Sequence, residues 1–224
     1  SRVELRILQK ICSPEEAWLA AQLGGSLESL DAIAERVGLP PAEARKALLQ
    51  LVRRGLAWFD KREDGPYFRL APFIVGIYEA QVDQMDHELA HLVEEYLAGG
   101  GAAGIMQPQP ALHRVVPAQG AVKSEWILPY DDVRSLFLSA KAFNVADCIC
   151  RVQQDHVGRR CDFPVHICLS FSMYERPPRS GDVTQAEALA LLDKAEEVGL
   201  VHTVSNVAHG VWYVCNCCGC CCGI

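Results

Sequence analysis

The first 55 residues consist of short amphipathic stretches separated by helix start and stop signals. Residues 13–16 read Ser-Pro-Glu-Glu, and the capping serine, the proline and the second glutamate predict a helix over 13–23. A second short helix is predicted over 30–36, ending at Gly38. A third begins at the prolines 40–41, repeats apolar residues every three or four positions and ends at Gly55.

Two short runs with strand-like composition follow the third helix. They cover residues 56–59 and 67–70 and flank the turn-forming sequence Glu-Asp-Gly-Pro at 63–66. Three helices followed by a two-stranded hairpin is the winged-helix arrangement. We therefore assign residues 1–71 to a winged-helix domain.

Residues 72–98 show a helical period again, which predicts one helix of about 25 residues. A helix of that length is expected to link two domains or to pair with a second copy of the chain as a homodimer. The glycines and prolines that follow indicate a linker, so 72–111 is assigned to the long helix and linker. The periodic apolar residues are Ile74, Ile77, Tyr78, Met85, Leu89, Leu92, Val93 and Tyr96.

Residues 112–224 mix both types of element. Strands are predicted at 114–116, 200–204 and 211–214, and helices near 131–143 and from the capping box at 184–187 to Gly199. The fold class predicted for the whole chain is α+β: a winged-helix domain, a long linking helix and a C-terminal α+β domain.

Cysteine is unusually frequent and unevenly distributed along the chain. The chain has 11 cysteines in 224 residues, and Cys12 is the only one before residue 148. Adjacent thiols are poorly placed for separate disulfides, because bridged residues must face each other. The pattern therefore indicates metal binding. The ten candidate ligands are Cys148, Cys150, Cys161, Cys168, Cys215, Cys217, Cys218, Cys220, Cys221 and Cys222.

The ten cysteines form two sequence groups, 148–168 and 215–222. Each can supply the four thiolates that one [4Fe–4S] cluster needs. Zinc is the alternative, although zinc sites typically use C-x₂₋₄-C pairs. The usual ferredoxin spacing is absent as well. We therefore expect one or two [4Fe–4S] clusters in this domain, with Zn²⁺ as the alternative.

The third helix of the winged-helix segment carries a candidate DNA-contacting set: Arg45, Lys46, Gln50 and Arg53. The chain has a net charge of −7, and its first 75 residues hold 11 Lys and Arg against 10 Asp and Glu. A near-neutral segment favours a packing role over DNA binding, because phosphate contacts supply much of the affinity for DNA.

His87 and His91 enclose a H-E-x-x-H motif on the predicted long helix. In zinc peptidases this spacing puts both imidazoles on one helix face, with the glutamate as general base. The motif is short and no third ligand stands out, so a polar helix face is the favoured explanation. A secretory signal and an apolar run of membrane-spanning length are both missing from these residues. Clustered thiols suit a reducing compartment, so we expect a cytoplasmic protein without membrane contact.

A set of segments stands out together: 71–79, Cys-Ile-Cys-Arg at 148–151, Gly158, Cys161, Pro164, Cys168, 195–202, Asn206 and Cys-Asn-Cys-Cys-Gly-Cys-Cys-Cys at 215–222. On these segments the chain resembles a known family, the prokaryotic 4Fe-4S ferredoxin-type proteins with an N-terminal winged-helix segment. The resemblance implies cluster binding by the cysteines, and electron transfer or redox chemistry as a ferredoxin-like component or oxidoreductase subunit. It also implies a redox partner or an additional ferredoxin segment. A redox- or metal-sensing DNA-binding regulator and a zinc protein or peptidase stay open as alternatives.

Overall fold

The computed structural model describes residues 2–103, 107, 110–117, 132–207 and 210–223 of the chain. The chain divides into two compact units, Ser1–Tyr96 and Leu97–Ile224, called here the N-terminal and the C-terminal unit. Both contain helices and strands, so the fold is α+β, as predicted. Within the described ranges, no helix is both long enough and apolar enough to cross a membrane.

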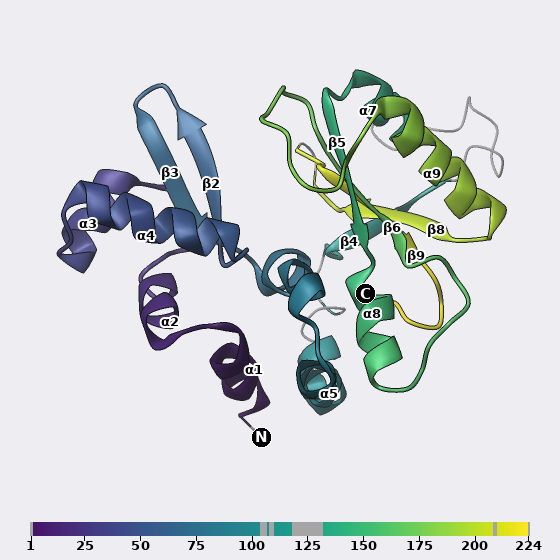
Figure 1. The fold of residues 1–224 in the computed structure, drawn as a ribbon, viewed down its shortest axis with the longest axis horizontal. Coiled ribbons are helices and arrows are strands. Elements are labelled where there is room, and N and C mark those ends of the chain that lie inside the picture. The colour runs from purple at the N-terminus through teal and green to yellow at the C-terminus, as the bar shows by residue number, and fades with distance from the viewer. Residues whose placement is uncertain (1, 104–106, 108–109, 118–131, 208–209, 224) are drawn as a thin grey trace. The chain divides into compact units, whose positions relative to one another are not determined.

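The N-terminal unit starts with four helices and a small antiparallel sheet (Figure 1). The sheet has the strand order β1-β3-β2, and β2 and β3 form a hairpin. The elements are α1 (Val3–Ile11), α2 (Pro14–Ala20), β1 (Glu28–Ser29), α3 (Leu30–Val37), α4 (Pro41–Arg53), β2 (Ala57–Arg62) and β3 (Gly65–Leu70).

Local signals in the sequence account for α2, α3 and α4. The Ser13 hydroxyl accepts a hydrogen bond from the Glu16 backbone N–H, and the Glu16 carboxylate accepts one from the Ser13 N–H, so the capping box is confirmed. Gly38 ends α3 in the left-handed region, with φ of 68°, where glycine carries no Cβ penalty. Ile33 of α3 and Leu48 of α4 are completely buried.

The single helix predicted over 72–98 is wrong. The structure has a π-turn η1 (Phe73–Ile77), a 3₁₀ helix η2 (Glu79–Gln84) and then α5 (His87–Tyr96). Ile74 and Val75 are extended, a conformation that β-branched residues favour. The Asp86 carboxylate accepts a 2.8 Å hydrogen bond from the Leu89 N–H and starts a new helix. The expected pairing of two copies through one long helix therefore loses its basis.

The C-terminal unit is built on a six-stranded sheet with the order β4-β8-β9-β6-β5-β7, and all its pairings are antiparallel. Its strands are β4 (His113–Val116), β5 (Ala142–Asp147), β6 (His166–Ser172), β7 (Asp182–Val183), β8 (Val201–Ser205) and β9 (Tyr213–Cys217). Its helical elements are η3 (Leu97–Gly101), α7 (Val133–Ser139), α8 (Ile149–His156) and α9 (Gln185–Glu197).

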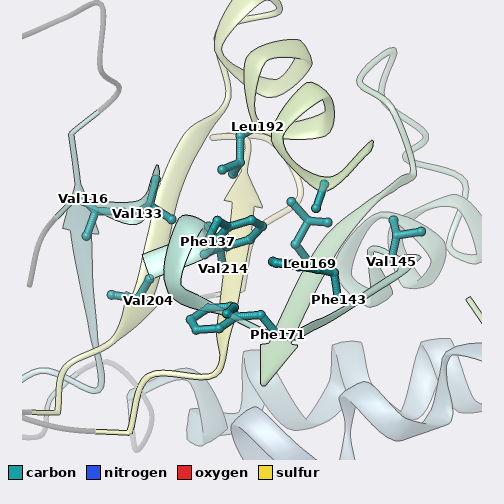
Figure 2. Packing of buried hydrophobic residues seen from close by; sticks show 12 residues of the cluster. Val116, Val133, Phe137, Phe143, Val145, Leu169, Phe171, Leu192, Val204 and Val214 are labelled. Atoms are coloured by element: carbon teal, nitrogen blue, oxygen red, sulfur yellow. The ribbon is translucent and has the colours of Figure 1, made fainter. Parts of the chain in front are cut away.

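One face of this sheet packs against α7 and α9. Figure 2 shows Phe137 of α7 and Leu192 of α9 beside Leu169, Val204 and Val214 of the sheet, in one buried apolar cluster. The capping box predicted at the start of α9 is confirmed. The Thr184 hydroxyl accepts a hydrogen bond from the Glu187 backbone N–H, and the Glu187 carboxylate accepts one from the Thr184 backbone N–H. The helix predicted near 131–143 is shorter than expected: α7 ends at Ser139, and the chain enters β5 three residues later. Residue 131 lies outside the described residues.

The opposite face of the sheet carries thiols. Successive side chains of a strand point to opposite faces. Val214 belongs to the helix-covered core, so Cys215 and Cys217 of β9 are on a face where α7 and α9 do not lie. In β6, Leu169 belongs to that core, and its neighbour Cys168 is on the thiol-bearing face. The antiparallel register of β6 and β9 sets Cys168 next to Cys215.

Candidate metal centre

All ten cysteines of the two sequence groups lie in described parts of the C-terminal unit and carry free thiols. Cys148 precedes α8, and Cys150 and Arg151 lie in its first turn. Cys161 follows α8, whereas Cys168 is in β6. The last group begins in β9 and continues to the end of the described chain, which returns to α8 (Figure 1). Elements that are far apart in sequence therefore bring both groups together.

Four cysteines gather most closely. The Sγ atoms of Cys161, Cys218, Cys220 and Cys221 all lie within 4.8 Å of one another. The Cys220 and Cys221 sulfurs are 3.7 Å apart. Cys218 and Cys221 are buried, and Cys220 is exposed. We call these residues the four-cysteine group. It takes one member from the first sequence group and three from the second, so the sequence groups are not the spatial groups.

The other six cysteines form a line of neighbouring thiols, called the six-cysteine group. The Cys222 and Cys217 sulfurs lie 3.4 Å apart. Cys150 forms side-chain hydrogen bonds with Cys148 and Cys222. Cys215 likewise forms side-chain hydrogen bonds with Cys217 and with Cys168, its neighbour on the adjacent strand. In order along the line, the members are Cys148, Cys150, Cys222, Cys217, Cys215 and Cys168.

No family model, curated protein or solved structure matches this chain. A function is therefore inferred from the residues and their geometry.

Neighbouring thiols set the acidity of the cysteines. A hydrogen bond from Cys150, together with the backbone N–H and charge of Arg151, lowers the pKa of Cys148 to about 6. The pKa of Cys150 is raised well above its usual value by its two thiol partners and by burial. The same causes raise the pKa of Cys215. Crowded thiols resist ionising together unless a cation compensates the charge, which is the property of a metal–thiolate site.

Arg151 is the one buried arginine among the described residues, with 3% of its surface exposed. One terminal nitrogen donates to the Pro164 carbonyl at 2.9 Å, and the other donates to the Asn216 carbonyl at 2.9 Å. These two carbonyls belong to the two cysteine-bearing segments. The guanidinium therefore ties the loop after α8 to strand β9.

The counter-charge of Arg151 comes from thiols. In the described part of the chain, no carboxylate forms an ion pair with this guanidinium. Its charge interacts with Cys148, Cys218 and Cys161, and it hydrogen-bonds Cys218. Burial alone raises the pKa of Cys218, but hydrogen bonds and the charge of Arg151 outweigh it and lower the value. Arg151 therefore interacts with both spatial groups.

A polar network lies on the helix-covered face behind the thiols. His202 is fully buried, and its Nδ1 lies 2.7 Å from the Asn216 Oδ1. The Asn216 amide donates to the Ile167 carbonyl at 2.6 Å. Asn216 thus holds β9 in a register that presents Cys215 and Cys217 on the other face. Sequence reasoning did not single out Asn216, although its position between two cysteines was a signal.

A cavity of about 420 Å³ opens beside the six-cysteine group. It is lined by Cys217 and Cys222, by Cys218 of the other group, and by residues of β4 and β8 that include His113 and Thr203. The Tyr213 hydroxyl and the His113 Nε2 are 2.8 Å apart, which orients the imidazole. The cavity leaves room for a group larger than one ion next to these thiols.

The remaining candidate residues lie in the N-terminal unit. The DNA-contacting candidates are all exposed on α4: Arg45, Lys46, Gln50 and Arg53. The Nε2 atoms of His87 and His91 are 3.1 Å apart on α5. The Lys10 ammonium lies 2.6 Å from the Glu88 carboxylate. The carboxylate that a peptidase would use as general base is therefore held in an ion pair. Among the described residues, no third ligand joins these histidines at single-ion distance.

Proposed function

We propose that the chain is an iron–sulfur protein that works in electron transfer or redox chemistry, as a ferredoxin-like component or subunit of an oxidoreductase system. The observation that carries the proposal is the gathering of ten free thiols in the C-terminal unit, three of which interact with a buried arginine that has no carboxylate partner among the described residues. An unpaired buried guanidinium is costly, so the surroundings of Arg151 must be anionic. Thiolates bound to metal supply that charge permanently.

Iron–sulfur is favoured over zinc alone by the number of thiols and by the resemblance described above. Ten cysteines exceed what two tetrahedral zinc sites use. One or two [4Fe–4S] clusters and a redox partner or further ferredoxin segment belong to the same proposal. In it, the helices and hairpin of the N-terminal unit form a winged-helix domain, and the protein works in a reducing cytoplasm.

Anaerobic purification followed by iron and acid-labile sulfide analysis, with EPR of the reduced protein, tests the proposal. We expect iron and sulfide in equal amounts, about four of each per cluster, and an EPR signal on reduction. Replacing Cys12, which lies outside both groups, gives the matched control, and Cys12→Ser should retain the full content. Protein that contains zinc but neither iron nor sulfide would overturn the proposal.

A second candidate function is a redox- or metal-sensing DNA-binding regulator, which the exposed basic side chains of α4 favour. It predicts duplex binding that selects a sequence and changes between metal-loaded and metal-free protein. Replacing Arg45 and Arg53 with alanine should weaken binding to all sequences and lower its salt dependence. Arg62→Ala on the hairpin is a basic-to-neutral control outside α4. Weak binding that is equal on every duplex would remove this candidate.

A further inference from the structure

Each spatial group contains a close pair of sulfurs, 3.7 Å apart in the four-cysteine group and 3.4 Å apart in the six-cysteine group, so the groups differ in how many thiols gather around one point. In the described part of the chain, the four-cysteine group is the one set of three or more possible ligands gathered tightly enough for a single ion. Tetrahedral zinc with bonds of about 2.3 Å sets its sulfurs about 3.8 Å apart. The Cys220–Cys221 separation of 3.7 Å agrees with this value. In a [4Fe–4S] cluster each thiolate binds a different iron, which requires wider spacing.

The six-cysteine group has the opposite character. Its members follow one another in a line from α8 to β6 and do not gather around one point. The 420 Å³ cavity opens beside Cys217 and Cys222 and provides volume that a single ion does not need. Six thiols also exceed the four that one cluster requires, so two of them are spare.

The surroundings of the four-cysteine group are those of a structural site. Cys218 and Cys221 are buried in a small apolar cluster with Ile167, Ala195 and Leu200, and Cys161 packs against it. A metal at this place joins the loop after α8 to the segment after β9, next to Ala195 near the end of α9. Structural zinc sites use four protein ligands and contribute directly to folding.

We infer that the chain holds two different centres: Cys161, Cys218, Cys220 and Cys221 bind one structural Zn²⁺, and the six-cysteine group supplies the ligands of the iron–sulfur cluster. The assignment of the cluster rests on the proposed function, whereas the zinc site does not. Arg151 interacts with thiols of both groups and offsets the negative charge of both centres.

Elemental analysis of matched variants tests this division. Wild-type protein, reconstituted anaerobically with iron, sulfide and zinc, should hold about one zinc and about four iron and four sulfide per chain. Cys220→Ser removes an exposed ligand of the four-cysteine group and should lower zinc about tenfold while iron and sulfide stay. Cys222→Ser should lower iron and sulfide while zinc stays.

Cobalt provides a spectroscopic readout of the four-cysteine group that does not rely on elemental analysis. Metal-free wild-type protein titrated with Co²⁺ should develop the absorption of one tetrahedral thiolate-bound ion, and this should persist in Cys222→Ser. Loss of iron and sulfide in Cys220→Ser, or about eight iron and no zinc in the wild type, would overturn the division. Zinc that depends on Cys220 in protein without iron would refute the proposed function and leave the zinc site standing.

Discussion

The interiors of the two units differ in the polar groups that they bury. Among the described residues, Gln81 is the only buried polar side chain of the N-terminal unit, whereas the C-terminal unit buries Arg151, Gln153, Gln154, His202 and Asn216. The N-terminal unit is stabilised by apolar burial and by capped helices. The C-terminal unit has one sheet face covered by α7 and α9 and one thiol-bearing face. The stability of its thiol-bearing side is therefore expected to depend on bound metal. Perturbing each unit separately tests this comparison.

Removing metal should have the largest effect. A metal chelator should increase amide hydrogen exchange in β8, β9 and α8 by about tenfold or more, because metal binding contributes directly to the folding free energy. Exchange in α4, which packs through Leu48 and Leu51, should stay unchanged. Peptide-resolved mass spectrometry measures both in one sample. Equal exchange in the C-terminal unit with and without chelator would show that its fold is independent of metal.

Replacing Arg151 with methionine keeps much of the volume and removes the charge. We expect a loss of about 3–5 kcal/mol in the free energy of unfolding of the C-terminal unit, together with a lower metal content, because buried thiolates lose their counter-charge. Anaerobic urea unfolding measures it. Arg160→Gln is the matched control: this arginine is exposed, 3.9 Å from Asp155, and its replacement should change stability by less than about 0.5 kcal/mol.

Cavities in the two apolar cores should separate the units. Phe137 is fully buried, with ring centroids 5.5 Å from Phe143 and 5.1 Å from Phe171, so Phe137→Ala should cost about 3–5 kcal/mol in the C-terminal unit. Leu48→Ala should cost about 2–5 kcal/mol in the N-terminal unit alone. Leu138, 63% exposed, is the control for α7. Destabilisation of both units by either variant would show that they unfold together.

The two capping boxes allow a like-for-like comparison. Ser13→Ala and Thr184→Ala each remove a hydroxyl that accepts a helix N–H, and each should cost about 1 kcal/mol in its own unit. Thermal unfolding measures the loss. Ser26→Ala lies outside these helices and serves as the control. An effect of Thr184→Ala well below that of Ser13→Ala would mean that metal, more than helix capping, determines the stability of the C-terminal unit.

The smallest expected effect is a pH dependence at Asp182. Two hydrogen bonds from Arg176 are the main cause that holds the pKa of this carboxyl well below its usual range. Since the pKa of Asp182 in the folded state lies below its unfolded value of about 3.9, its contribution to stability is fully present above that pH and is lost as the pH falls. Asp182→Asn should flatten the stability profile below about pH 4. Glu175→Gln, an exposed neighbour, should leave the profile unchanged.

Sequence reasoning worked where neighbouring residues decide the structure. The caps at Ser13 and Thr184 and the stop at Gly38 act within four residues, and all three are confirmed. The alternation of Ile167, Leu169 and Phe171 was a visible strand signal for β6 that the cysteines obscured. The long helix failed for a different reason. A periodic apolar pattern continues through the extended residues Ile74 and Val75, so the pattern does not show that the helix is interrupted there; the backbone geometry does.

From the sequence alone it follows that ten thiols are concentrated between residues 148 and 222, in a part of the chain that mixes helices and strands. Tertiary structure alone decided which thiols meet. Cys161 lies beside Cys218, Cys220 and Cys221 because the fold brings the loop after α8 next to the segment after β9. Arg151 links the loop to β9 by hydrogen bonds. Ligand type is a local property of residues, whereas the distance between ligands depends on the register of a sheet whose strands are distant in sequence.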